Sequence, residues 1–440
     1  MSSYWAAYAW LPDGCQASVS FEVDAGRFAR VRVGVEPRAG QQILSGVTLP
    51  GLANGHSHAF HRVLRGRTHA GSGSFWTWRQ QMYALAARLD PDSYLALARA
   101  VFVEMAQAGY TVVGEFHYLH HDQHGRRYAD PNAMGKALIQ AATEAGVRLT
   151  LLDACYLAGG LAATGHLPLD PVQTRFADSD VDHWRARVSL LSDLDRVRIG
   201  GAVHSVRAVP AEALSKIGEA IGERPLHVHL SEQPAENAAT RAFYGRTPTE
   251  LLDDHGLLGR RSTAVHATHL TDTDIKVLGG SQTSACFCPT TERDLADGIG
   301  PARRLASAGS PLTLGSDQQA VIDPFEEMRG LELHERLATG ERGCFTPGDL
   351  IMTGSAAGYR SLGWPEGGRI ADGTLADFVV IRADSVRTAG ARPDQIGFAA
   401  TATDVDQVVI AGEVIVRDGR HRLGSAARLL AAALDQLGEM

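Results

Sequence analysis

The chain has 440 residues, of which 44% are hydrophobic and 21% are charged, and its formal net charge is −8. This composition is typical of a folded globular protein and excludes a long disordered chain. The length fits two or three domains of about 150 residues, or one barrel of about 250 residues or more with a smaller module. The mild acidity, without any lysine- or arginine-rich block, argues against a nucleic-acid partner.

We expect neither a targeting segment nor a membrane segment in this sequence. It contains no run of about 18 apolar residues, so we expect no membrane-spanning helix and no membrane partner. The first 16 residues have no basic start and carry Pro12, Asp13 and Gly14, which argues against a signal peptide. Five cysteines, an odd number, are scattered along the chain. They do not suggest a disulfide framework, and we expect a cytoplasmic location.

Both ends of the chain have the period-two alternation of half-buried strands. Residues 18–23 and 30–35 alternate around a turn at residues 24–26, which predicts a hairpin. Near the other end, residues 376–381, 407–410 and 413–416 read as strands with tight turns. Because chain termini often lie close together, we expect one small β-sandwich-like domain from residues 1–47 plus 366–423. An Ala/Leu pattern predicts a C-terminal helix in residues 424–440.

The middle of the chain alternates short apolar runs with longer helical patterns. Eight strand candidates lie at residues 46–49, 111–116, 148–154, 198–203, 225–230, 263–267, 283–287 and 311–314. Helical patterns separate them, for example at residues 93–108, 131–145, 210–221 and 271–278. This order predicts a (β/α)8 TIM-type barrel over residues 48–365. An open doubly wound sheet is less favoured, since no G-x-G-x-x-G follows the first strand.

Histidines and one aspartate follow several of these strands, where a barrel carries its active site. His56 and His58 are two residues apart, so an extended segment points both imidazoles the same way. The H-x-H pair alone would favour two surface histidines in a loop, but His229 and Asp317 end two other strands. Three histidines and one aspartate suit a single Zn2+ or Fe2+ with an open position for water. The bound ion would lower the pKa of that water to about 7.

Two further side chains at strand ends suit proton transfer. His227 and His229 share a face of one strand, and we choose His229 as the ligand because Glu232 follows it by three residues. Glu232 would then carry a proton between the water and the leaving group; without the metal ligands it would read as an acid in a first helical turn. His266 ends the next strand and would stabilise developing charge, although a lone histidine is more often a core residue.

The lysine count favours one metal ion per chain over two. Enzymes of this architecture with two metals bridge them with a modified lysine at a strand end. The chain has three lysines, Lys136, Lys216 and Lys276, and each falls in a helical pattern.

Several longer segments resemble the mononuclear-metal branch of the amidohydrolase superfamily. They are residues 50–58 (PGLANGHSH), 75–79 (FWTWR), 114–122 (GEFHYLHHD), 128–131 (YADP), 204–209 (HSVRAV) and 368–377 (GRIADGTLAD). Within the branch, the likeness is greatest to the formimidoylglutamate deiminases. The resemblance implies hydrolysis of N-formimidoyl-L-glutamate to N-formyl-L-glutamate and ammonia, a step of histidine breakdown, by a homodimer.

The resemblance also implies a site for a substrate with two carboxylates and a cationic amidine. It places Arg79, Tyr118, His204 and Arg207 against the substrate, and a forked guanidinium can hold a carboxylate through two hydrogen bonds. Two positions depart from the family pattern: His61 stands where glutamine is expected, and Gln318-Gln319 where Ser-His is expected. His61 would still touch the substrate. These departures bear on substrate choice, whereas the ligand Asp317 is kept.

In the expected reaction, a hydroxide on the metal attacks the formimidoyl carbon. Asp317 holds the metal and accepts the proton of the water, Glu232 passes a proton to the leaving nitrogen, and His266 stabilises the tetrahedral state.

Two other functions stay open on the sequence alone. One is a deaminase or chlorohydrolase of the same branch that acts on a guanine-like or triazine ring. The other is a non-catalytic relative that keeps the barrel as a scaffold, although such a chain would be expected to lose ligands. A run of histidines at residues 117–124 also suggests a second metal, but its Asp and Gly residues favour a loop.

Overall fold

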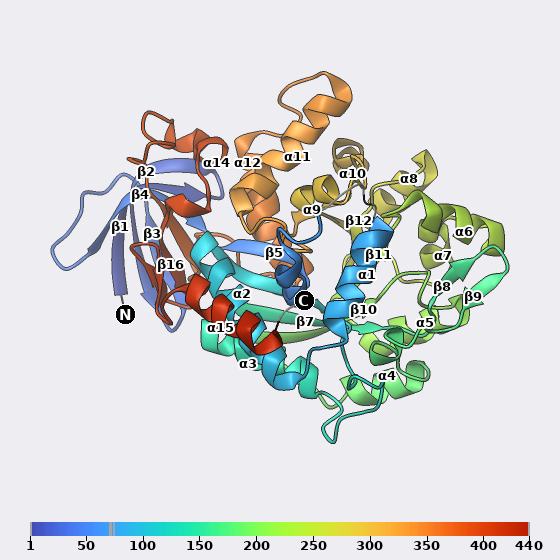
Figure 1. The fold of residues 1–440 in the computed structure, drawn as a ribbon. Coiled ribbons are helices and arrows are strands. Elements are labelled where there is room, and N and C mark those ends of the chain that lie inside the picture. Colours follow the sequence, from blue (N-terminus) through green and yellow to red (C-terminus); the bar gives the residue numbers. More distant parts are fainter. Residues whose placement is uncertain (1, 70–72, 74, 439–440) are drawn as a thin grey trace.

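The computed structural model describes residues 2–69, 73 and 75–438, and its helices surround one sheet while a second sheet lies beside them (Figure 1). The described part contains two eight-stranded sheets and one short hairpin, β8 (Gly160–Ala162) with β9 (Gly165–Leu167). Met1 and residues 439–440, which belong to the expected domain ranges, lie outside the described residues. In the part of the chain that is described, no helix has the length and apolarity needed to cross a bilayer.

The first sheet is the barrel. Its strand order is β5-β6-β7-β10-β11-β12-β13-β14, and each neighbouring pair is parallel. The ends of this order meet, because the amides of Ser316 and Asp317 both donate to the carbonyl of His56, at 3.1 and 3.0 Å. The strands are β5 (Leu52–Ser57), β6 (Tyr110–His117), β7 (Arg148–Cys155), β10 (Val197–Val203), β11 (Leu226–Leu230), β12 (Ser262–His266), β13 (Ser284–Phe287) and β14 (Leu312–Leu314). The expected (β/α)8 barrel is confirmed.

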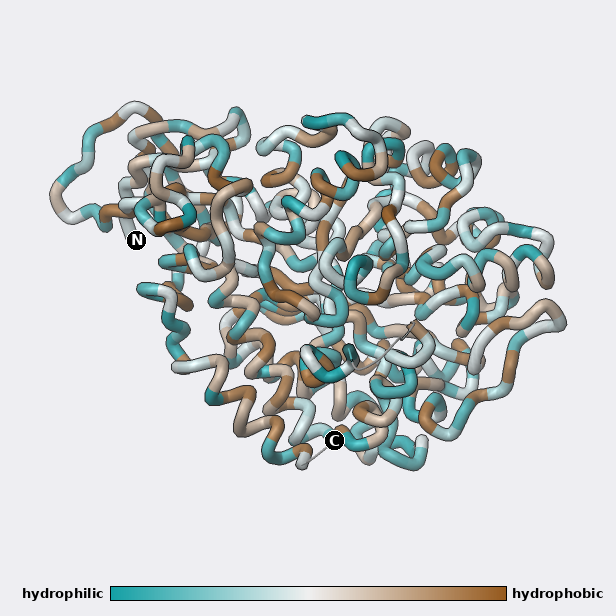
Figure 2. The backbone as a smooth tube through the Cα atoms, turned by 45° about the horizontal axis from the view of Figure 1, so that its top comes forward, coloured by the Kyte–Doolittle hydropathy of each residue, from teal (hydrophilic) through white to brown (hydrophobic). Residues whose placement is uncertain are grey.

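Helices connect the barrel strands and surround the sheet (Figure 1). Between barrel strands lie α1 (Phe75–Ala86), α2 (Pro91–Ala108), α3 (Ala133–Ala145), α4 (Val181–Val188), α5 (Ala211–Ile221), α6 (Pro234–Tyr244), α7 (Pro248–Asp254), α8 (Asp272–Ser281), α9 (Pro289–Asp294) and α10 (Ala302–Ala308). After the last barrel strand come α11 (Pro324–Thr339), α12 (Pro347–Met352), α13 (Gly358–Ser361), α14 (Ile396–Ala399) and α15 (Ala426–Leu437). Along many of them hydrophobic and hydrophilic stretches alternate, as expected for helices with one face on the core (Figure 2).

Local sequence signals explain where these helices begin and end. At α2, the Asp90 carboxylate accepts a hydrogen bond from the amide of Ser93, and Gly109 ends the helix at a φ of 107°. Side-chain caps of this kind satisfy amides that the first turn leaves without partners. A left-handed residue after the last turn, as at Gly109, does the same for the carbonyls.

One predicted barrel strand is wrong. Residues 46–49 belong to β4 (Gln42–Pro50), which pairs with strands of the second sheet, and the first barrel strand is β5. A short apolar run does not indicate which sheet it joins. Gly51 alone separates the two strands, and a Cβ at this position would lie 2.6 Å from the Tyr359 hydroxyl. The predicted domain boundary after residue 47 falls inside β4.

The second sheet combines both ends of the chain. Its order is β18-β17-β16-β15-β4-β1-β2-β3. The strands are β1 (Ser2–Leu11), β2 (Gly14–Asp24), β3 (Arg27–Arg32), β15 (Phe378–Ile381), β16 (Val405–Ile410), β17 (Glu413–Arg417) and β18 (Arg420–His421), with β4 between β1 and β15. The predicted hairpin is β2 with β3; the pattern did not reveal β1. The division of the chain into domains stays a prediction.

A buried ion pair joins barrel strand β7 to the segment that enters β15. Arg148 Nε and Nη2 donate to the Asp377 carboxylate at 2.7 and 3.1 Å, and both side chains are buried. Asp377 also accepts from the Tyr359 hydroxyl and from the amide of Ala411, each at 2.7 Å. This bidentate pair and its two added hydrogen bonds hold the two sheets in a defined arrangement.

Candidate active site

Four ligand-type side chains meet at the carboxyl ends of the barrel strands. His56 and His58 come from β5, His229 from β11, and Asp317 from the turn after β14. His229 Nε2 lies 3.1 Å from His56 Nε2 and 3.3 Å from His58 Nε2. Asp317 Oδ1 lies 3.3 and 3.4 Å from the same atoms of His56 and His58. Ligands about 2.0–2.1 Å from one tetrahedral ion are about 3.4 Å apart, so these four atoms have the spacing of a ligand set.

The hydrogen bonds of these histidines leave lone pairs facing one another. His58 Nδ1 donates to the carbonyl of Phe116 and His229 Nδ1 donates to the carbonyl of His204, both at 2.9 Å. In a neutral ring with a protonated Nδ1, Nε2 carries a lone pair. Two such lone pairs 3.3 Å apart repel each other unless a cation lies between them. The donor set therefore fits a divalent metal ion.

Burial keeps the histidines neutral, which is the form that binds metal. It lowers the pKa of His56 to about 3 despite the neighbouring Asp317. Burial also lowers the pKa values of His58 and His229. For Asp317 burial acts in the opposite direction, but the hydrogen bond and charges of the histidines outweigh it and hold the pKa of this carboxyl below its usual value. The site thus presents three neutral imidazoles and one carboxylate.

Glu232 and His266 lie beside this ligand set. His266 Nε2 is 3.7 Å from Glu232 Oε1 and 3.9 Å from Asp317 Oδ2. On its other side His266 Nδ1 is 3.5 Å from Glu292 Oε1. Burial disfavours the imidazolium, but these three carboxyls outweigh it and raise the pKa of His266 well above its usual value. Burial raises the pKa of Glu232. The two side chains therefore form a buried ion pair beside the ligand set.

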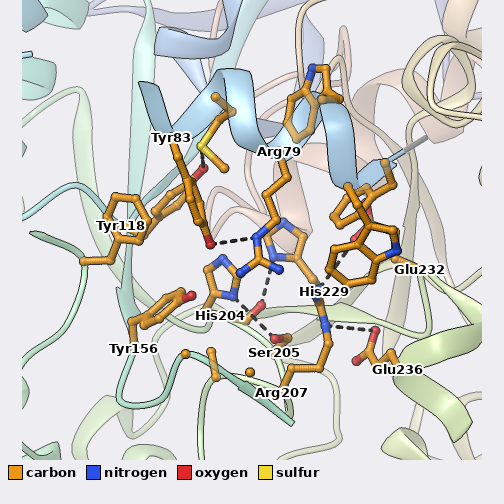
Figure 3. Close-up of a pocket in the computed structure, with 18 of the residues that line it drawn as sticks. Arg79, Tyr83, Tyr118, Tyr156, His204, Ser205, Arg207, His229, Glu232 and Glu236 are labelled. Atoms are coloured by element: carbon orange, nitrogen blue, oxygen red, sulfur yellow. Dashed lines mark hydrogen bonds and ion pairs between the residues drawn. The ribbon is translucent and has the colours of Figure 1, made fainter. Parts of the chain in front are cut away.

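A cavity of about 270 Å3 opens beside these groups (Figure 3). Its lining includes all but one of the residues that the sequence predicted for the site: His58, His61, Arg79, Tyr118, His204, Arg207, His229, Glu232, His266 and Asp317. His56 is the exception, because it is fully buried behind the cavity wall. The structure thus brings the predicted metal ligands, proton carriers and substrate contacts together; their roles stay proposals.

The two predicted arginines enter the cavity from different elements (Figure 3). Arg79 lies on α1 and donates from Nε to the Tyr83 hydroxyl at 2.7 Å. Among the described residues no carboxylate lies within ion-pair distance of Arg79. Arg207 follows β10, and each of its two contacts, with Glu232 and Glu236, is 3.7 Å long. Arg79, which stacks over the rings of Trp76 and Tyr83, therefore keeps N–H groups without a carboxylate partner, while Arg207 is shared between two acids.

The two departures from the family pattern differ in position. His61 lines the cavity, and its Nε2 lies 2.9 Å from the Tyr118 hydroxyl. Gln318 donates to Asp294 at 2.7 Å, and Gln319 donates to the Ser57 hydroxyl at 2.9 Å. Neither glutamine lines the cavity. Only His61 is therefore placed to influence substrate choice directly.

Tyr83, Tyr156, Glu236 and Gln173 are among the residues of the site that were not predicted from the sequence. Tyr83, Tyr156 and Glu236 line the cavity, and Gln173 lies behind two of them. The helical spacing of Glu236, one turn after Glu232, is a signal that could have revealed it. Burial raises the pKa of Glu236 to about 7 although Arg207 is near.

The four histidines of the run at residues 117–124 lie outside the cavity lining. His117, His120 and Asp153 come close enough to share an ion. However, Arg187 already holds Asp153 through two hydrogen bonds of 2.7 and 2.8 Å, and His120 Nε2 donates to the carbonyl of Ala154. These contacts describe a buried polar network. Residues 118–132, all of them described, lie in neither a helix nor a strand.

Comparison with known proteins identifies the family. A model described as amidohydrolase family matches residues 47–415. Formimidoylglutamate deiminase from Pseudomonas aeruginosa is 35% identical over 458 aligned positions that cover 100% of both chains. 5′-Deoxyadenosine deaminase from Methanothermobacter thermautotrophicus is 26% identical and covers 90% of this chain and 89% of its own.

Solved structures agree with this result. An amidohydrolase from Brucella melitensis is 33% identical, with a TM-score of 0.92 over 99% of this chain and 100% of its own. A zinc complex of atrazine chlorohydrolase from Arthrobacter aurescens shares the fold, with a TM-score of 0.86 at 20% identity over 99% of this chain and 100% of its own. The matched family model and the relative of equal length confirm the resemblance. The chain therefore belongs to the amidohydrolase family.

Proposed function

We propose that this hydrolase converts N-formimidoyl-L-glutamate and water to N-formyl-L-glutamate and ammonia. Family membership supports hydrolysis of a carbon–nitrogen bond, and the relative that is 35% identical over the whole chain supports the substrate. The observation that carries the proposal is the cavity itself. It has neutral imidazoles and a carboxylate on one wall and the Arg79 and Arg207 guanidinium groups on others.

His56, His58, His229 and Asp317 would hold one divalent ion, for which Zn2+ is our first choice and Fe2+ the second. Such an ion, when bound, lowers the pKa of a coordinated water to about 7 and so supplies a nucleophile at neutral pH. The softness of imidazole nitrogen suits both metals.

The protein's own groups would move the protons. As water attacks the formimidoyl carbon, Asp317 accepts one of its protons. Glu232 delivers a proton to the nitrogen, so that the carbon–nitrogen bond breaks and ammonia leaves. His266 donates a hydrogen bond to the negative charge that develops on oxygen. The contacts of 3.7 Å and 3.9 Å among Glu232, His266 and Asp317 keep this proton path short.

The glutamyl part of the substrate would lie against the arginines. Arg79 has no carboxylate partner among the described residues, and a substrate carboxylate can bind the N–H edge of its guanidinium group with two hydrogen bonds. Tyr118, His204 and His61 add polar contacts in the same cavity. We further expect a cytoplasmic homodimer that needs neither nucleic acid nor membrane.

The direct test is ammonia release by zinc-loaded protein from N-formimidoyl-L-glutamate, beside a panel of guanine-like amines and a chlorotriazine. Turnover of the formimidoyl substrate alone supports the proposal. Faster turnover of a ring compound would instead support a ring deaminase or chlorohydrolase. The ring of such a substrate would stack on aromatic side chains of the cavity such as Trp76 and Trp78.

Carboxylate recognition can be tested separately. The monoamide at the side-chain carboxyl lacks one carboxylate of the substrate, and the monoamide at the α-carboxyl lacks the other. If Arg79 holds one of them, R79M should raise KM for the diacid about 10- to 100-fold and leave KM for one monoamide unchanged. R293M is the matched control, because Arg293 pairs with Glu326 outside the cavity. Gently purified protein that contains no bound metal and turns over no substrate would favour a non-catalytic scaffold.

A further inference from the structure

A buried glutamine organises one wall of the cavity. Arg79, Tyr83 and Tyr156 line this wall, and Gln173 lies behind them with no exposed surface. Hydrogen bonds connect all four side chains, and we refer to them as the Gln173 network. Tyr83 and Tyr156 come from different parts of the chain, and both point toward the centre of the cavity (Figure 3).

The orientation of the Gln173 amide is set by its backbone contacts. Its Oε1 accepts a hydrogen bond from the amide of Asp170 at 2.8 Å. Its Nε2 faces the carbonyl of Gly159 at 2.9 Å and the hydroxyl oxygens of Tyr83 and Tyr156 at 2.9 and 2.8 Å. An amide nitrogen donates hydrogen bonds and does not accept them. The two protons of Nε2 serve these three oxygens, and neither tyrosine hydroxyl can donate its own proton to Gln173.

This arrangement leaves a hydroxyl proton without a protein acceptor. Tyr83 also accepts from Arg79 Nε at 2.7 Å, and a guanidinium group cannot accept the hydroxyl proton in return. Burial raises the pKa of Tyr156, and its hydrogen bond with Tyr83 adds to the shift. Only one of the two hydroxyl protons can take part in a hydrogen bond between the two tyrosines. Among the described residues no acceptor is available for the other, and the cavity is the space that both hydroxyls face.

The missing acceptor has a definite chemical character. It lies next to the Arg79 guanidinium group, which has no carboxylate partner among the described residues, so an anion suits this position. It accepts hydrogen bonds from a hydroxyl and from N–H groups, so it carries several lone pairs in one plane, as a carboxylate does. Both properties match the acidic groups of the proposed substrate.

We propose that one of the two hydroxyls of Tyr83 and Tyr156 donates its proton to a substrate carboxylate beside Arg79. Gln173 is the positioning residue that orients this hydroxyl proton toward the cavity. The inference rests on the proposed function, which it deepens by naming the residues that recognise the acid. Gln173 acts through the tyrosines and does not itself line the cavity.

The sharpest variant is Gln173→Glu, which keeps the size of the side chain but replaces the donor by an acceptor. A carboxylate at this position would accept the tyrosine protons and turn them away from the cavity. We expect KM for N-formimidoyl-L-glutamate to rise about 10- to 100-fold, with kcat changed less than about threefold. The double variant Y83F/Y156F removes both protons and should give the same result.

The single variants and a control complete the series. In Y156F the remaining proton of Tyr83 is free for the substrate, so the effect should be smaller than in the double variant. Tyr94→Phe is the matched control, because Tyr94 is buried outside the cavity lining. The midpoint of thermal unfolding, measured on every variant, separates lost recognition from lost folding.

Monoamide substrates separate recognition from a structural effect. The rise in KM should vanish for the monoamide that lacks the recognised carboxylate. An equal rise for the diacid and both monoamides would overturn the proposal, and so would an unchanged KM in both Q173E and Y83F/Y156F.

Failure of the proposed function would be seen separately, as no turnover by the unaltered protein. In that case calorimetric binding of N-formyl-L-glutamate to the same variants still tests the Gln173 network. Binding that weakens about 10-fold or more in Q173E supports it, and binding that is absent or equally strong in all variants overturns it.

Discussion

His58 and His229 bring their Nε2 atoms within 3.3 Å of each other while each donates its Nδ1 proton to a backbone carbonyl. Two unprotonated nitrogens in this position repel each other in an empty site. The carbonyls of β6 and of the turn after β10 thus fix both histidines in the tautomer that suits metal binding. At metal sites, the hydrogen-bond partner of the other ring nitrogen commonly has this role.

The first prediction concerns this ligand set. H229A should lose stoichiometric metal, because it removes one of four ligands and the lone pair opposite His58. His227→Gln is the matched control on the same strand: His227 Nε2 lies 3.1 Å from the carbonyl of Ser361 and not beside the other ligands. Metal analysis after gel filtration measures both. Equal metal content in the two variants would contradict the assignment of His229.

Removal of the metal should also lower stability. A ligand that binds only the folded state raises the free energy of unfolding, so a chelator should lower the midpoint of thermal unfolding and added Zn2+ should restore it. The H229A variant should respond to neither. A midpoint that the chelator leaves unchanged in the parent protein would argue against a bound ion.

The second prediction concerns His61. Glutamine can also reach the Tyr118 hydroxyl, so H61Q should keep kcat/KM within about threefold of the parent value. H61A removes the hydrogen bond of 2.9 Å and should raise KM about 3- to 10-fold. Gln318→Ser should leave KM unchanged, because Gln318 points to Asp294 and away from the cavity. A larger change in KM for Gln318→Ser than for H61A would show that Gln318, and not His61, influences substrate choice.

The third prediction is a pH dependence. Burial raises the pKa of Glu236 to about 7 from 4.5, so the folded protein holds this proton over a range in which the unfolded chain has lost it. Its contribution to stability is therefore complete below about pH 4.5 and is lost as the pH rises through 7. Glu236→Gln has no such loss. Between pH 5 and pH 8 its free energy of unfolding should therefore rise by up to about 3 kcal/mol relative to that of the parent protein.

Urea unfolding of parent and variant at both pH values measures this gain. Glu219→Gln is the control, since it removes an exposed carboxylate instead of a buried one. A difference in unfolding free energy that does not change with pH would contradict the effect of burial.

The fourth prediction concerns the contact between the two sheets. Asp377→Ala leaves Arg148 buried without its partner and also removes the acceptor of Tyr359, so it should cost about 3–5 kcal/mol of unfolding free energy. Asp394→Ala removes an exposed partner of Arg392 and should cost much less. Urea midpoints measure both, and comparable losses would show that the buried pair has no special role.

Much of the barrel could be predicted from the sequence because parallel strands buried on both faces produce short apolar runs. Seven of the eight predicted runs overlap barrel strands, such as residues 148–154 with β7. The run at residues 46–49 joined the other sheet, since pairing partners far apart in sequence are not encoded in a local pattern. Strand β1 was missed although Val19, its partner residue in β2 opposite Ala6, was in a predicted strand.

The sequence by itself determined the family, the barrel and the residue types that could bind a metal, because these follow from composition, periodicity and motifs in consecutive residues. Only the tertiary structure decided that Gln318 faces Asp294, that Arg79 lacks a carboxylate partner among the described residues, and that the Gln173 amide lies against two tyrosine hydroxyls. These relationships depend on hydrogen-bond directions between segments that are distant in the chain. Such directions exist only after the strands have closed and the loops have packed over their ends.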